Sequence, residues 1–132
     1  MPALTTAGRL LGHPLTVGAV AVGGAAYLAA VDPHDPGRYP PCPFLLLTGW
    51  RCPGCGGLRA VHDLLHGDLA AALTQNPLAV LAVLSAVLGW AFWARARLTG
   101  RGSPPRIPPF AAWAAAAGVA AFWLLRNVSG TS

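Results

Sequence analysis

Three cysteines are the residues of this chain whose type and spacing best suit chemistry. They are Cys42, Cys52 and Cys55, and no other cysteine occurs among the 132 residues. Cys52 and Cys55 have the Cys-x-x-Cys spacing, and Pro53 and Gly56 in the same stretch favour a tight turn. Thiols held in this way can exchange disulfides, form a stable disulfide or bind a soft metal ion.

One interpretation of these cysteines is a zinc site. Cys42, Cys52 and Cys55, with His62 as a fourth ligand, would form a set of three thiolates and one imidazole, and zinc prefers such ligands. A single Cys-x-x-Cys pair is only half of the usual zinc signature, and the gap between Cys42 and Cys52 is not diagnostic. Zinc is therefore the candidate cofactor, and these four residues are its candidate ligands.

The same cysteines support two other interpretations. A reactive dithiol at Cys52 and Cys55 would lie at the start of a helix, whose dipole lowers a thiol pKa, with Arg59 one turn further on. Thiol oxidoreductases, however, place this motif after a strand of a soluble fold, and the sequence predicts no strand here. In the structural interpretation, Cys42 pairs with Cys52 or Cys55, or the thiols are simply buried.

The composition indicates a membrane protein. Hydrophobic residues make up 55% of the chain and charged residues 10%, whereas about 25% charged residues is typical of soluble domains. A net charge of +5 is compatible with nucleic-acid binding, but the arginines flank apolar runs instead of forming one solvated basic face. We therefore expect the lipid bilayer, and not a nucleic acid, as the partner of this chain.

Three apolar segments predict transmembrane helices, at about 12–31, 77–94 and 110–125. Asn76 can cap the second helix, with Pro77 at its first position. Residues typical of a membrane interface lie near the ends of the second and third segments: Trp90, Trp93, Arg95, Arg97, Phe110, Trp113, Trp123 and Arg126. The alternatives are a signal peptide for the first segment and a surface helix for the third.

The distribution of arginine predicts the orientation in the membrane. The segment 95–109 carries Arg95, Arg97, Arg101 and Arg106 without any acidic residue, so the positive-inside rule places it in the cytoplasm. With three spans, the N-terminus, which carries Arg9, is also cytoplasmic. The three cysteines then lie on the outer side of the membrane.

Residues 32–76, between the first two spans, are expected to form a motif loop and one amphipathic helix. Apolar residues three and four apart predict a helix that starts near Gly56: Leu58, Val61, Leu65 and Leu69. Gly67 can end this helix, and Asp68 can cap a short continuation. An adjoining face would carry Cys55, Arg59, His62 and His66. We expect an interfacial or re-entrant helix packed against the spans, with Arg59 donating hydrogen bonds to carbonyls of the Cys-Pro-Gly-Cys turn or of a helix end.

From position 42 to about 81, the chain resembles a family of small bacterial membrane proteins known as domain of unknown function (DUF) 2752. The resemblance rests on the motif core Cys42, Cys52, Pro53, Cys55, Gly56 and Arg59, together with Thr48-Gly49 and Ala60. Leu58 stands where the family usually has threonine, so a hydroxyl at that position is not indispensable. The resemblance implies a membrane protein with a shared Cys-Pro-x-Cys-Gly motif, and it implies no established reaction.

The sequence thus predicts an all-α membrane protein that forms a single domain over residues 1–132. It shows no constellation of residues typical of an enzyme active site. We expect a small accessory or interaction subunit of a bacterial cell membrane, whose partner is another membrane protein or a second copy of the chain. The alternative is a membrane thiol-redox or zinc-binding protein that uses Cys42, Cys52 and Cys55.

Overall fold

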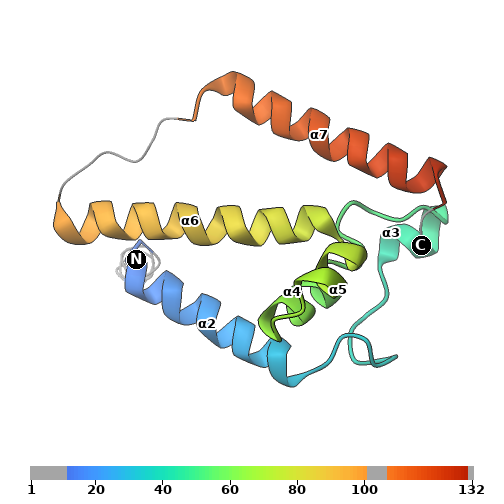
Figure 1. Ribbon diagram of the computed structural model, residues 1–132, viewed down its shortest axis with the longest axis horizontal. Helices are drawn as coiled ribbons and strands as arrows, with labels where there is room; N and C mark the ends of the chain where they lie inside the picture. Colours follow the sequence, from blue (N-terminus) through green and yellow to red (C-terminus); the bar gives the residue numbers. More distant parts are fainter. Residues whose placement is uncertain (1–11, 101–106, 131–132) are drawn as a thin grey trace, which may run out of the picture.

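The structure, a computed structural model, describes residues 12–100 and 107–130, and its regular elements in these ranges are all helices. They are α2 (Pro14–Ala30), α3 (Pro43–Thr48), α4 (Gly57–Leu65), α5 (Leu69–Gln75), α6 (Pro77–Thr99) and α7 (Pro109–Val128). In Figure 1, α6 crosses the middle of the molecule, with α7 on one side and α2 on the other, while α4 and α5 lie near the start of α6. The prediction of an all-α fold is confirmed.

Two of the described helices are long and apolar enough to cross a membrane. They are α6, with 23 residues, and α7, with 20 residues. At 1.5 Å per residue they measure about 34 and 30 Å, which matches a hydrocarbon core of about 30 Å. Asn76 caps α6 as predicted, because its side-chain oxygen accepts a hydrogen bond from the backbone N–H of Ala79 at 3.1 Å.

The predicted first span is the shorter apolar helix α2, which has 17 residues. It packs against α6 near its N-terminal end, where the indole of Trp90 lies over Gly18. The indole Nε1 also donates a hydrogen bond to the carbonyl of Pro14 at 3.1 Å. Trp90 therefore joins two helices, a role beyond the interfacial position that the sequence predicts for it.

The buried core of the described chain is small and lies where α4, α5 and α6 meet. It consists of Ala60, Ala72 and Val80, with Leu64 and Ala79 packed against it. The long helices leave most of their large apolar side chains exposed, for example Val22 on α2, Phe92 on α6 and Leu125 on α7. Apolar surface of this extent is unfavourable in water and favourable in lipid.

The short helices α4 and α5 begin and end where the sequence predicts. Gly67 follows α4 with a φ of 81°, in the left-handed region, and Asp68 caps α5 by accepting a hydrogen bond from Ala71 N at 2.8 Å. The predicted apolar stripe, however, is not the face that packs on α6. Leu58 and Leu65 are 49% and 44% exposed, whereas Ala60 is fully buried. Small side chains face the protein because they let α4 approach α6 closely.

Some features of the predicted topology lie outside the described residues. These are Arg9, Arg101 and Arg106, three of the arginines on which the orientation rests. Arg95 and Arg97 belong to the last turns of α6, and the guanidinium of Arg97 lies 5.7 Å from the centre of the Trp93 ring. The orientation itself stays a prediction.

The contact of Gly18 with Trp90 leads to a first prediction. A Cβ atom at Gly18 would lie 2.7 Å from Cζ2 of Trp90, so Gly18→Ala pushes the indole from its hydrogen bond with Pro14. We expect Gly18→Ala to destabilise the protein by about 1 kcal/mol, a typical cost of overpacking. The control is Gly23→Ala in the same helix, where an added Cβ meets nothing within 4 Å. Thermal unfolding in detergent should show a lower Tm for Gly18→Ala only, and equal Tm values would contradict this packing.

Candidate functional site

The candidate site is the motif loop where it meets the last turns of α7. Trp50 and Phe44 stack against Trp123, with ring centres 5.4 and 6.3 Å apart. Trp123 Nε1 donates a hydrogen bond to the carbonyl of Arg51 at 2.9 Å. Asn127 binds both backbone groups of Arg51, accepting from its N–H at 2.9 Å and donating to its carbonyl at 3.0 Å. The loop is therefore fixed to α7 just before Cys52.

The three cysteines meet in one cluster. Cys42 precedes α3, while Cys52 and Cys55 lie on the turn between α3 and α4. The Sγ atoms of Cys52 and Cys55 are 3.0 Å apart, those of Cys42 and Cys52 are 3.5 Å apart, and all three lie within 4.8 Å of one another. All three side chains are half-buried and are free thiols. The structure thus brings together the three sulfur atoms that the sequence singles out.

The thiols differ in acidity because their surroundings differ. Burial, together with the hydrogen bond to the neighbouring Cys52 thiol, raises the pKa of the Cys55 thiol to about 12. The backbone N–H of Leu45, in the first turn of α3, and the Cys52 thiol lower the pKa of Cys42. Among these two, Cys42 is the more readily ionised when no ion is bound.

A buried asparagine holds the cysteine turn against α6. Asn76 is 0% exposed, and its side-chain nitrogen donates hydrogen bonds to the carbonyls of Pro53 at 2.9 Å and Cys55 at 3.2 Å. Its side-chain oxygen caps α6 at Ala79. One buried amide therefore binds two carbonyls of the turn and one N–H of a long helix.

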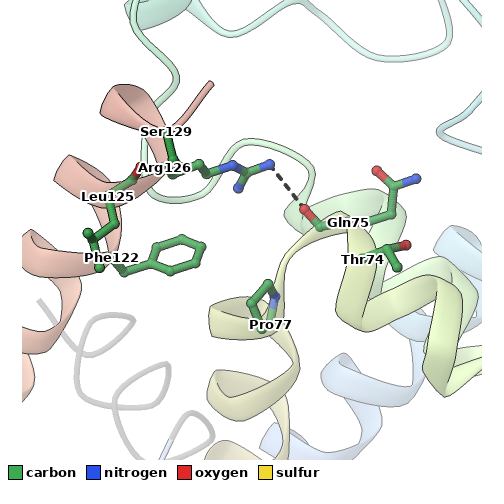
Figure 2. Close-up of a pocket in the computed structure, with 7 residues that line it drawn as sticks. All are labelled: Thr74, Gln75, Pro77, Phe122, Leu125, Arg126 and Ser129. Carbon is green, nitrogen blue, oxygen red and sulfur yellow. Dashed lines mark hydrogen bonds between the residues drawn. The ribbon is translucent and has the colours of Figure 1, made fainter. Parts of the chain in front are cut away.

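Arg126 of α7 is a second clamp on the same turn. Its guanidinium donates from Nη1 to the carbonyl of Cys55 at 2.9 Å and from Nη2 to the carbonyl of Gln75 at 3.1 Å. Figure 2 shows this side chain reaching from α7 to Gln75 beside a cavity of about 230 Å³ that Phe122 and Pro77 also line. The position of Arg126 near the end of an apolar segment predicts a place at the membrane interface, whereas the side chain lies inside the site.

Gly56 is the residue that makes this close approach feasible. It adopts a φ of 79°, which side chains rarely tolerate, and an added Cβ would lie 3.0 Å from the carbonyl oxygen of Gln75. Gly56 is also the N-cap of α4, so the helix begins at Gly57. Cys55 consequently lies before the helix, and the prediction that it shares a helical face with Arg59 and His62 is wrong.

Arg59 and His62 lie elsewhere than the sequence analysis places them. Arg59 Nε donates to a backbone carbonyl as expected, but the acceptor is Pro33, at 3.2 Å, and not the cysteine turn. His62 does not join the three sulfur atoms, since its Nδ1 bonds the carbonyl of Leu28 at 2.8 Å and its Nε2 lies 3.6 Å from Asp32. Its assignment as fourth ligand of the cysteines has no support in the geometry.

A cavity of about 610 Å³ opens beside the cysteines. Its lining includes the three cysteines together with Arg51, Arg59, Arg126 and Tyr39. Three arginines in the lining of one cavity with three cysteines give it positive charge, which would help to balance a negatively charged metal–thiolate centre. The cavity also leaves room for an external ligand at the cluster.

The residues missed by sequence reasoning are Trp123, Arg126 and Asn127, and their signal was present but ambiguous. Arg126 and Asn127 follow Trp123 by three and four positions, so both lie on the same side of α7 as Trp123. A tryptophan and an arginine near the end of an apolar helix are equally typical of a membrane interface. Asn127 was the better clue, because an asparagine on the same face can bind a backbone amide and carbonyl together.

The bonds of Asn76 give a second prediction. Asn76→Asp keeps the oxygen that caps α6 but replaces the donor nitrogen with an oxygen that faces two carbonyls. We expect a loss of about 2 kcal/mol or more, because the Pro53 carbonyl loses its bond to this side chain and a charge is buried beside two carbonyl oxygens. The control is the opposite exchange, Asp68→Asn, at the exposed cap of α5, where both residue types cap equally well. Thermal unfolding compares the two, and an unchanged Tm for Asn76→Asp would contradict the clamp.

A family model matches part of this chain, and the matched part contains the cysteine turn. Residues 42–90 match the model of a family described as "Protein of unknown function (DUF2752)". The match begins at Cys42, contains all three cysteines, Asn76, α4 and α5, and ends within α6 at Trp90. No curated protein and no solved structure matches the chain significantly. The segment 42–90 is therefore similar to this family, and the match includes the motif core on which the resemblance in the sequence rests.

Proposed function

We propose that this chain is a small integral membrane protein with three spans, α2, α6 and α7. The exposed apolar side chains of all three helices support this assignment, because lipid is the solvent in which such surfaces are stable. With 17 residues, α2 measures about 26 Å, which is short for a span but is tolerated where the bilayer thins locally. The N-terminus then lies in the cytoplasm, and the motif loop lies on the outer side.

The function that the site supports best is binding of one zinc ion by Cys42, Cys52 and Cys55. The observation that carries it is the meeting of three sulfur atoms from two separate segments within 4.8 Å. In a tetrahedral site with Zn–S bonds of 2.3 Å, sulfur atoms are about 3.8 Å apart. The distances of 3.0 and 3.5 Å are close to this value, so small side-chain rotations suffice. A zinc ion deprotonates a coordinating thiol, which offsets the raised pKa of Cys55.

Three thiolates leave one position of a tetrahedral zinc ion open. Among the described residues no further histidine, cysteine or carboxylate lies with the three sulfur atoms. The open position would face the adjacent cavity and its arginines. A water molecule or a donor group of a partner protein can occupy this position. Such a site agrees with an accessory or interaction subunit in which the metal ion crosslinks the motif loop. The partner is then a second membrane protein or another copy of the chain.

Thiol redox chemistry is the second candidate function, and the distance between Cys52 and Cys55 favours it. Their sulfur atoms are 3.0 Å apart, so a movement of about 1 Å forms a disulfide bond of about 2.05 Å. This reaction removes two hydrogen atoms and needs an electron acceptor. The raised pKa of Cys55 disfavours it as the attacking thiolate.

Metal content and protein mass separate these two functions. Protein purified without chelator, stripped and reloaded with Co²⁺, should show thiolate-to-cobalt charge-transfer absorption corresponding to one ion per chain. Cys42→Ser and Cys52→Ser should each abolish this absorption, and zinc should displace cobalt from the parent. Thr48→Ser, a matched exchange of a non-ligand in the same loop, should retain it. Protein that shows no such absorption and a mass two hydrogen atoms below the reduced value would overturn zinc binding in favour of the disulfide.

The orientation can be tested independently of the cysteine chemistry. One added cysteine is introduced at the exposed Asp35 of the motif loop or at Gly102 in the segment after α6. A membrane-impermeant thiol reagent applied to intact cells should label Asp35→Cys above the parent level and leave Gly102→Cys at that level. Lysed cells provide the control in which both sites react. The reverse pattern would place the motif loop in the cytoplasm.

A further inference from the structure

A second group of potential metal ligands lies apart from the cysteines, where the end of α2 meets α4. Asp32 and His34 belong to the loop that follows α2, and His62 comes from α4. Asp32 Oδ1 is 2.8 Å from His34 Nδ1 and 3.6 Å from His62 Nε2, and one ligand atom of each residue lies within 4.8 Å of the others. Ligand atoms of a tetrahedral site with bonds of 2.0–2.1 Å are about 3.3 Å apart, so these distances bracket the required value.

The hydrogen bonds of His62 leave the correct nitrogen available. Its Nδ1–H donates to the carbonyl of Leu28 at 2.8 Å, since a carbonyl can only accept. In the neutral ring, Nε2 then carries a lone pair, and this atom is the one near Asp32. Metal-binding histidines typically donate their other N–H to a backbone carbonyl in this way, which fixes the tautomer and the ring orientation. His62 is 12% exposed, so its ring is held in place.

The carboxylate of Asp63 lies next to the second ring nitrogen of His34. Asp63 Oδ1 lies 3.6 Å from His34 Nε2, so His34 can direct Nδ1 to an ion while Nε2–H faces Asp63. The other oxygen, Asp63 Oδ2, is buried without any hydrogen-bond partner, and the side chain is 12% exposed. A buried carboxylate oxygen without a partner is costly unless a positive charge lies nearby.

The charged residues around Asp32, His34 and His62 also favour binding of a cation. Asp32 and Asp63 have no arginine within ion-pair distance in the described part of the chain, where Arg38 pairs with Asp35 instead. Asp32 Oδ1 accepts a hydrogen bond from the backbone N–H of His34 at 2.8 Å, which fixes the carboxylate beside the two imidazoles. The group thus combines two carboxylates with two imidazoles and, among the described residues, has no arginine paired to it.

We propose that Asp32, His34 and His62 bind a divalent first-row transition metal ion, with Asp63 as a positioning residue for His34. In the ion-bound state His34 binds through Nδ1 and its proton is on Nε2, facing Asp63, while Asp32 binds through Oδ1 and His62 through Nε2. Two imidazoles and one carboxylate suit zinc, iron(II), cobalt or nickel, and they leave at least one position open to water or another ligand. This site is separate from the cysteine cluster and does not depend on zinc binding there.

The test measures Co²⁺ and Zn²⁺ binding to the purified full-length protein in detergent after chelator treatment. The parent should bind two ions, only one of which gives thiolate-to-cobalt absorption. The variant with Cys42, Cys52 and Cys55 all changed to Ser should retain one ion, with visible cobalt bands but no charge transfer. In that background, Asp32→Asn and His34→Ala should weaken binding by more than about 100-fold, and Asp63→Asn by about 10–100-fold.

The matched control is His66→Ala. His66 lies one turn after His62 with its ring stacked on it at 4.2 Å, but its Nδ1 bonds the carbonyl of His62 and it is not in the ligand group. This variant should bind the second ion as the parent does.

Circular dichroism tests whether each variant is folded. Asp32 and His34 are exposed, so their variants test the site even if His62 variants unfold. Unchanged affinity in Asp32→Asn and His34→Ala, or no ion bound by the triple serine variant, would overturn the proposal. Zinc binding by the cysteines is tested separately, by the presence or absence of the thiolate-to-cobalt band.

Discussion

The side-chain amide of Asn76 is the interaction on which the rest of the described structure depends. It lies fully buried between the cysteine turn and α6, and it bonds the carbonyls of Pro53 and Cys55 and the N–H of Ala79. A carboxylate could cap the helix but could not donate, and an apolar residue would remove the bonds to the Pro53 carbonyl and the Ala79 N–H and leave only Arg126 on the Cys55 carbonyl. The turn that holds Cys52 and Cys55 is thereby attached to the start of the longest helix.

The bonds from α7 complete this attachment from the other side. Trp123 and Asn127 hold Arg51, and Arg126 binds the carbonyls of Cys55 and Gln75 (Figure 2). These bonds are partly buried, and a carbonyl that loses its partner in such a place is costly. The planar guanidinium can reach two carbonyls together, which lysine cannot do with one compact ammonium group. The last turns of α7 therefore fix the motif loop relative to α6.

The two ligand groups differ in the chemistry that they offer. The cysteines lie beside Arg51, Arg59 and Arg126, which can balance the single negative charge of a zinc ion with three thiolates. The group around Asp32 has two carboxylates and no such arginine among the described ion pairs, so its own charge attracts a cation. Arg59 contacts both regions, because it lines the cavity beside the cysteines and bonds the carbonyl of Pro33, next to Asp32.

Much of the fold follows from the sequence alone, because local physics determines it. Apolar run length predicts the long helices, and Asn76, Asp68 and Gly67 act where helix capping rules place them. The proximity of Cys52 and Cys55 was likewise predictable from their spacing, whereas the spacing of Cys42 was not diagnostic. Only the tertiary structure decided which residues surround them. Gly56 takes a left-handed φ, which removes Cys55 from the helical face of Arg59 and His62. Arg126 reaches Cys55 across 71 positions of sequence, and no local pattern encodes a contact that depends on how distant helices pack.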